Sequence, residues 1–237
     1  MKPACAPFWL FWLLAGPGVA AAQPALRAGP PVAWLRASTE QRLRGPWGVF
    51  SEVEVRQANG QLPAQALGRL ALRWHAGRSF SLSTGYVLAR NQAPHDPETT
   101  LPEHRFYQEL ALADASGPVR ASHRLRAEER WLRPAPGTAF AFVPRLRYQL
   151  RLVVPLHRGG RLPVGSAYLL AADELFFGLG PRTRVLEENR LLGGLGYRLA
   201  PGTALEIAYL WQTQAAGAIG YEAARRQAVQ VAVCTGW

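Results

Sequence analysis

The stretch from Val119 to Pro155 decides the fold, and its two arms are VRASHRLRAEERWL (Val119–Leu132) and FVPRLRYQLRLVVP (Phe142–Pro155). In the second arm, arginine or glutamine alternates with leucine or tyrosine from Arg145 to Leu152. Successive side chains of a β-strand point to opposite faces, so each arm forms a strand with one charged and one apolar face. A helix would scatter the same arginines around its circumference. The stretch therefore predicts a hairpin of two long strands.

The first 22 residues have the three parts of a secretory signal peptide. Lys2 gives a basic start, Phe8–Leu14 an apolar core, and Ala20–Ala22 the small residues before a cleavage site. A retained membrane anchor is the alternative, but this apolar core is too short to cross a bilayer. We therefore expect residues 1–22 to be a signal peptide and residues 23–237 to form one domain, because no shift in composition indicates a second.

The composition excludes several classes of function. Cys5 leaves with the signal peptide, so Cys234 alone remains and no disulfide or cysteine metal site can form within one chain. The formal net charge of +11 comes almost entirely from arginine, since the single lysine is Lys2. The arginines alternate along predicted strands, without a basic tail or a nucleic-acid-binding motif. The sequence predicts no nucleic-acid partner, no metal site and no cofactor.

Alternating segments follow one another along most of the chain, and no helical period of similar length interrupts them. Besides the two arms, they are Val32–Leu43, Trp47–Gln57, Ala66–His75, Ser79–Arg90, His104–Ala113, Gly165–Phe177, Glu187–Leu199, Thr203–Thr213 and Arg225–Trp237. Short connections alternate with long ones, as in outer-membrane barrels. We predict an all-β fold, a single antiparallel up-and-down transmembrane β-barrel of 10–12 strands. Twelve is preferred, because bacterial barrels usually have an even number and Gln23–Pro31 could supply a short strand.

Alternation alone does not decide which face lies inside, because a soluble β-protein would bury the apolar face that a membrane barrel turns to lipid. Serine and glycine recur on the charged face, as a narrow lumen requires, and the last strand ends in an aromatic residue, Trp237. Tryptophans also lie near strand ends, as in interfacial girdles: Trp34, Trp47, Trp74, Trp131 and Trp211. These features favour the outer membrane as the location, with a soluble periplasmic β-protein as the alternative. Expected partners are outer-membrane lipid and, through the C-terminal strand, the barrel assembly machinery.

Four segments together resemble a bacterial family catalogued as domain of unknown function 2490: HRLRAEERWL (His123–Leu132), LRYQLRLVVPL (Leu146–Leu156), YLLAADELFFGL (Tyr168–Leu179) and ENRLLGGLGYRL (Glu188–Leu199). The similarity continues to the C-terminal strand, where Cys234–Trp237 departs from the family's more regular aliphatic and aromatic finish. The resemblance implies an exported, barrel-like protein of Gram-negative bacteria. It implies no activity, because the family has none assigned.

The charged inner wall is the candidate functional site. By strand parity and neighbouring acids, the predicted lumen network comprises Arg120, Arg124, Arg126, Glu128, Arg130, Arg145, Arg147, Arg151, Glu188, Arg190, Arg198 and Glu206. Asp173 or Glu174 joins it, because adjacent strand residues face opposite ways, and the other of the two is expected near a rim. One interpretation is a ladder of ion pairs that fills a small barrel, because the planar arginine fork can satisfy carboxylates in two directions. The other is a narrow, porin-like path whose arginine excess attracts small anionic solutes.

A barrel enzyme that acts on membrane lipid, such as a deacylase, is the alternative function. That chemistry requires a nucleophile with a base, typically serine with histidine. Ser122 and His123 are adjacent, so they lie on opposite faces of a strand and cannot pair with each other. No catalytic motif is present, and the sequence therefore favours a non-enzymatic protein.

Overall fold

The computed structural model describes residues 32–57, 63–93, 96–116, 119–157, 159, 161–180, 186–215 and 224–236. The predicted signal peptide (residues 1–22), the segment Gln23–Pro31 and the terminal Trp237 lie outside the described residues. No described segment is a helix that is long and apolar enough to cross a membrane.

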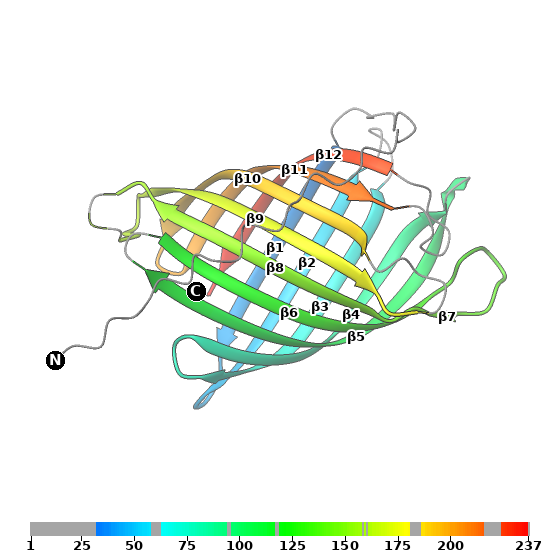
Figure 1. Ribbon diagram of the computed structural model, residues 1–237, viewed down its shortest axis with the longest axis horizontal. Helices are drawn as coiled ribbons and strands as arrows, with labels where there is room; N and C mark the ends of the chain where they lie inside the picture. The colour runs from blue at the N-terminus through cyan, green and yellow to red at the C-terminus, as the bar shows by residue number, and fades with distance from the viewer. Residues whose placement is uncertain are drawn as a thin grey trace, which may run out of the picture.

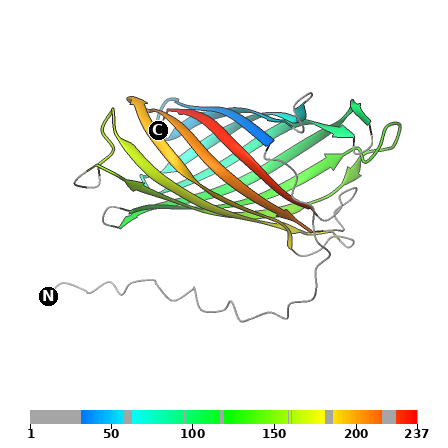
Figure 2. The same ribbon diagram turned by 90° about the horizontal axis from the view of Figure 1, so that it is seen from above.

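One closed sheet forms the whole described structure (Figures 1 and 2). Its strands are β1 Val32–Arg42, β2 Trp47–Gln57, β3 Pro63–Ala76, β4 Phe80–Ala93, β5 Asp96–Ser116, β6 Val119–Leu132, β7 Ala141–Phe142, β8 Arg145–Pro155, β9 Ala167–Gly178, β10 Leu186–Ala200, β11 Thr203–Gln214 and β12 Ala224–Thr235. β7 is a two-residue strand that pairs with the end of β6, whereas β6 itself continues the wall to β8. The predicted all-β barrel is confirmed.

Eleven of the described strands, all except β7, form the wall, which agrees with the predicted range of 10–12. The preference for twelve is not supported. Sequence-adjacent wall strands pair antiparallel, but β1 and β12 close the barrel as a parallel pair that runs from Val32 opposite Ala228 to Thr39 opposite Thr235. A parallel closing pair is what an odd number of up-and-down strands requires.

The two ends of the barrel differ in their connections. The short turns between β1 and β2, β3 and β4, and β10 and β11 lie where β12 ends, and we call this the short-turn end. Gly45, Gly77 and Gly202 have φ of 67°, 81° and 70° in these turns, a left-handed conformation that favours glycine. The opposite end, which we call the long-loop end, carries the connection from β6 to β8.

Parity divides the wall into an apolar outer face and a charged inner face. Large apolar side chains are exposed outside, including Leu35, Val53, Leu70, Leu195 and Ile207. Charged side chains of the opposite parity are among the most buried in the protein, and Glu128 and Arg126 are each only 2% exposed. The alternation in sequence therefore becomes a barrel with its charges inside.

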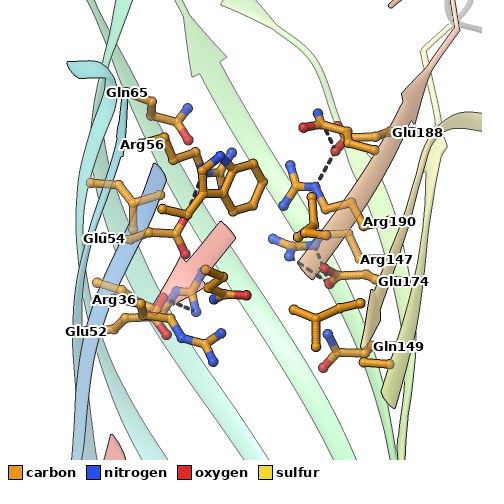
Figure 3. A pocket seen from close by; sticks show the side chains of 18 of the residues that line it. Arg36, Glu52, Glu54, Arg56, Gln65, Arg147, Gln149, Glu174, Glu188 and Arg190 are labelled. Carbon is orange, nitrogen blue, oxygen red and sulfur yellow. Dashed lines mark hydrogen bonds and ion pairs between the residues drawn. The ribbon is translucent and has the colours of Figure 1, made fainter. Parts of the chain in front are cut away.

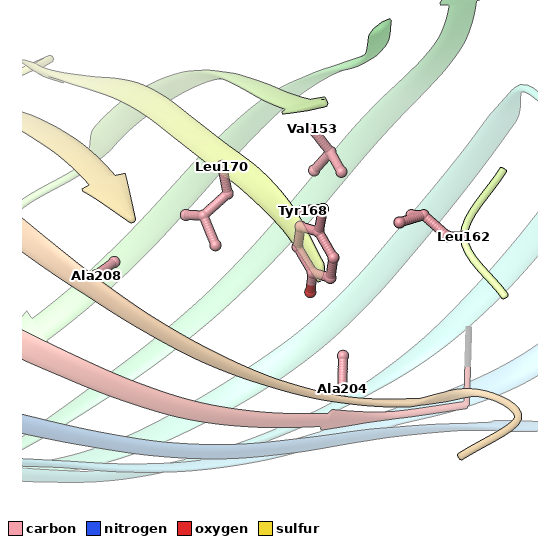
Figure 4. Close-up of a cluster of buried hydrophobic side chains, with 6 residues drawn as sticks. All are labelled: Val153, Leu162, Tyr168, Leu170, Ala204 and Ala208. Carbon is pink, nitrogen blue, oxygen red and sulfur yellow. The ribbon is translucent and has the colours of Figure 1, made fainter. Parts of the chain in front are cut away.

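An apolar cluster occupies the inside of the barrel toward the short-turn end, next to β8–β11 (Figure 4). Its members are Val153, Leu162, Tyr168, Leu170, Ala204 and Ala208. Leu162 comes from the connection between β8 and β9, and its carbonyl oxygen accepts a hydrogen bond from Arg198 Nη1 (2.8 Å). A Cβ at Gly196 would collide with the Tyr168 ring, so glycine is required there. The cluster narrows one side of the lumen at this end.

Candidate functional site: the charged lumen

A cavity of about 1110 Å³ runs inside the barrel and receives side chains from all eleven wall strands. It is lined near the long-loop end by residues such as Gln65 and Asn91, and near the short-turn end by Ser38 and Ala113. Fourteen arginines and eight glutamates are among the described residues that line it. The lining therefore carries an excess of positive charge.

Glu128 on β6 is the centre of the network on one side of the cavity. Register places it directly opposite Arg145 of β8, and places Arg126 opposite Arg147. Arg145 Nη2 donates to Glu128 Oε2 (2.6 Å), and Arg147 Nη1 donates to Glu128 Oε1 (2.6 Å). Both carboxylate oxygens are therefore satisfied by charged donors, as a buried acid requires.

Arg147 joins Glu128 to a second carboxylate, Glu174 on β9. Its Nη2 donates to Glu174 Oε1 (2.7 Å), and the same oxygen accepts a bond from Arg124 Nη2 (2.7 Å). One guanidinium thus bridges acids from two strands, which a lysine could not do with the same geometry. The chain of contacts from Arg145 to Arg124 ties β6, β8 and β9 together.

Two acids of β5, Glu103 and Glu109, complete this side and were not predicted. Glu103 accepts bonds from Arg105 (2.8 and 2.9 Å) and from Arg130 Nε (2.6 Å). Glu109 accepts a bond from Arg126 Nε (2.8 Å). The predicted strand began at His104 and therefore left Glu103 out. Glu103, Arg105 and Glu109 lie at every second position, so they share one face of the strand, and this spacing is the signal in the sequence that could have identified the two acids.

Aromatic rings lie beneath several of the guanidinium groups. Phe176 is 4.6 Å from Arg147 and 4.5 Å from Arg190, measured from ring centroid to guanidinium carbon. Trp34 is 4.1 Å from Arg56 in the same measure, and it is buried inside the barrel. Its predicted place in an interfacial girdle was wrong, because its parity is that of the inward-facing Arg36. These cation–π contacts stabilise the guanidinium groups without requiring a carboxylate partner.

The opposite side of the cavity has its own charged pairs, from β1 and β2. Arg56 contacts Glu54, and Arg36 Nη2 lies 3.8 Å from Glu206 Oε2 of β11. Figure 3 shows the two sides facing each other across the cavity: Arg36, Glu52, Glu54, Arg56 and Gln65 opposite Arg147, Gln149, Glu174, Glu188 and Arg190. Charges thus face the open space from both sides.

Most residues of the predicted network lie in or against the cavity. Those lining it are Arg124, Arg126, Arg130, Arg145, Arg147, Arg151, Glu174, Glu188, Arg190 and Glu206, with Glu128 buried beneath them. Arg151 pairs with Glu206, and Arg190 with Glu188.

Two predicted members lie elsewhere, and of the two adjacent acids Glu174 is the one that lines the cavity, while Asp173 lies near the middle of β9 and not near a rim. Arg120 is exposed at the start of β6, and Arg198 holds the Leu162 connection at the short-turn end. Asp173 points to the outer face, where its Oδ1 accepts a hydrogen bond from Asn189 Nδ2 (2.6 Å). Since Asp173 and Glu174 are adjacent on β9, the inward position of Glu174 requires the outward position of Asp173.

The described residues offer little for metal or nucleophilic chemistry. Among them, no three His, Cys, Asp or Glu side chains come together as a metal site. The ring of His123 makes its hydrogen bond through Nδ1 to the Tyr148 hydroxyl (2.8 Å), rather than to a serine. The arrangement is suited to holding or passing negatively charged groups, because its fixed charges are mostly guanidinium groups.

A family model described as "Protein of unknown function (DUF2490)" matches residues 32–221 of the chain. The matched range begins at the first residue of β1 and includes the wall strands from β1 to β11. No curated protein matches the chain.

Proposed function

We propose that this chain, which belongs to the DUF2490 family, is an outer-membrane barrel whose lumen gives small anions a narrow path across the membrane. The observation that carries the proposal is the excess of arginine over glutamate around a cavity that reaches toward both ends of the barrel. Fixed positive charge at close quarters raises the local concentration of anions and repels cations.

The outer face supports the membrane location. Its exposed aliphatic side chains form a belt on the wall, and aromatic rings lie near both ends of that belt. Trp47 and Trp74 are paired near the short-turn end, while Trp131 packs against Phe106 (5.8 Å between centroids) near the long-loop end. Such a band with aromatic edges is typical of transmembrane barrels.

Two features limit the width of the path. The long arginines of β3, β6 and β8 extend into the lumen, and the apolar cluster that contains Leu162 and Tyr168 occupies one side of the lumen near the short-turn end. A barrel of about this strand number leaves little room beyond its own side chains. The solutes that fit are therefore small and negatively charged, such as chloride, phosphate or short organic acids.

Conductance of the folded protein in a planar bilayer tests this function. We expect a small conductance whose reversal potential in a potassium chloride gradient has the sign of chloride preference, because fixed guanidinium charge favours anions. Insertion is verified independently by a heat-dependent change in gel mobility of the same preparation. Silent membranes with verified insertion would contradict the pore, and would leave a lumen filled by ion pairs as the description of the barrel.

A further inference from the structure

Asp173 is in an unusual place for a carboxylate if the barrel spans a membrane. It lies near the middle of β9 on the outer face, with Leu150 of β8 on one side and Leu191 of β10 on the other. The same face of β9 carries Leu169, Ala171, Leu175 and Phe177 above and below it. Asp173 is thus a half-buried acid surrounded by side chains suited to lipid.

Other acids on the outer face are placed differently. Among the described residues, Asp96, Glu98, Asp114 and Glu129 all lie within three residues of the end of their strand. Such positions are close to headgroups and water. An ionisable side chain in the apolar middle of a wall is costly and usually serves a function or meets a polar partner. Asn189 satisfies one carboxylate oxygen of Asp173, and within the described part of the chain no second donor bonds to the other oxygen.

Groups suitable for a close protein contact lie around Asp173. Tyr148 on β8 is a diagonal neighbour, because it pairs with Leu175, two residues from Asp173 along β9. Gly193 pairs with Ala171 beside Asp173, and among the described residues other than its two chain neighbours no atom lies within 4 Å of where a Gly193 Cβ would be. In membranes, small residues let backbones approach closely, and polar side chains hold the contact by hydrogen bonds.

We propose that this face, formed by Tyr148, Leu150, Asp173, Asn189 and Gly193, binds the same face of a second copy of the chain within the membrane. The inference rests on the proposed membrane location, but it does not depend on whether the lumen conducts. A second copy is the occupant that the donors and acceptors fit, because the face carries a hydroxyl donor and a carboxylate acceptor side by side. Such a face is complementary to itself.

A two-fold axis satisfies both groups at once. The strands are tilted around the barrel (Figure 1). In a tilted pair of strands, diagonal neighbours and not directly opposite ones lie at a similar depth, and Tyr148 and Asp173 are diagonal neighbours by register. An axis along the barrel direction between β8 and β9 places Tyr148 of each copy opposite Asp173 of the other. The Tyr148 hydroxyl then donates to the second copy's carboxylate while it accepts from His123, the ring to which it is already bonded. Leu150 falls close to the axis and meets its own equivalent.

Cross-linking across this axis tests the dimer. The full chain is expressed in a Gram-negative host, with Cys234→Ser to remove the natural thiol and Leu150→Cys to place a new one. We expect mild oxidation of isolated membranes to convert most of the variant to a disulfide-linked dimer. The matched control is Leu70→Cys, an exposed outer position on β3, which we expect to remain monomeric.

Two further variants separate the proposed contact from random collision. Added to Leu150→Cys, Tyr148→Phe removes only the hydroxyl and is expected to weaken dimerisation roughly tenfold, because two equivalent hydrogen bonds are lost. Asp173→Leu should abolish the cross-link without impairing folding, since it replaces a lipid-facing carboxylate by an apolar side chain.

The outcomes distinguish this proposal from the proposed function. A membrane-inserted Leu150→Cys variant that stays monomeric, or that cross-links to a different envelope protein, overturns the dimer and leaves the pore untouched. Recovery of the chain as a soluble protein overturns the membrane location itself, and the dimer with it. A dimer that Asp173→Leu leaves intact also contradicts the proposed contact.

Discussion

Replacing Glu128 by glutamine should lower the free energy of unfolding by about 3–5 kcal/mol, the usual cost of breaking a buried ion pair from one side. Glu128 is 2% exposed and neutralises both Arg145 and Arg147. Glutamine keeps the shape but supplies a single neutral acceptor, so the buried guanidinium of Arg145 loses its counter-charge and Arg147 keeps only Glu174. Urea unfolding of the barrel folded into lipid vesicles, followed by tryptophan fluorescence, measures the loss.

The adjacent Glu129 gives the matched control. It has the same chemistry on the same strand, but it points outward and is exposed. Glu129→Gln should change the free energy of unfolding by no more than about 0.5 kcal/mol, as is usual for surface positions. Equal losses for the two variants would mean that Glu128 has no special role in holding the lumen.

Replacing Arg124 and Arg151 together by glutamine should weaken the anion preference of the conductance. Both side chains line the cavity and are 25% exposed, so passing ions can approach their charge. They contact Glu174 and Glu206, which would keep only the charged partners Arg147 and Arg36 and so carry less compensated negative charge beside the path. We expect the ratio of anion to cation permeability to fall clearly toward one, while a conductance remains, because the lining keeps a smaller excess of arginine over glutamate.

A control with the same change in net charge isolates the effect of the lumen. Arg90→Gln with Arg120→Gln removes two positive charges from exposed positions that do not line the cavity. This double variant should keep the anion preference of the parent protein. If the two double variants shift selectivity equally, the preference depends on the overall charge of the barrel and not on its inner wall.

Parity in the sequence was enough to predict the barrel and much of its charged lining. In β8, the alternation from Arg145 to Arg151 places guanidinium groups inside and Leu146 or Tyr148 outside without any knowledge of neighbours. Asp173 shows where parity fails. β9 has apolar side chains on both faces, so the sequence does not tell which of two adjacent acids points inward.

Strand lengths and barrel closure depend on pairing between segments far apart in the chain, and they could not be predicted from the sequence. β5 extends from Asp96 to Ser116, well beyond the predicted segment, because β4 and β6 continue to pair with it on both sides. The parallel contact between β1 and β12 joins the two ends of the described wall, and no local pattern encodes it. Local alternation predicts strands and faces, whereas lengths and closure require the partner strands.

The orientation of the wall in lipid is the central claim, and β12 allows its most direct test. Single cysteines at Val229, Val231, Val233 and Gln230, in a Cys234→Ser background, can carry nitroxide labels with little disturbance at the outer positions. In lipid vesicles, we predict high accessibility to oxygen at the three valines and low accessibility at Gln230, which lines the cavity. Valine positions that are instead more accessible to a water-soluble nickel chelate than to oxygen would contradict a lipid-facing outer wall.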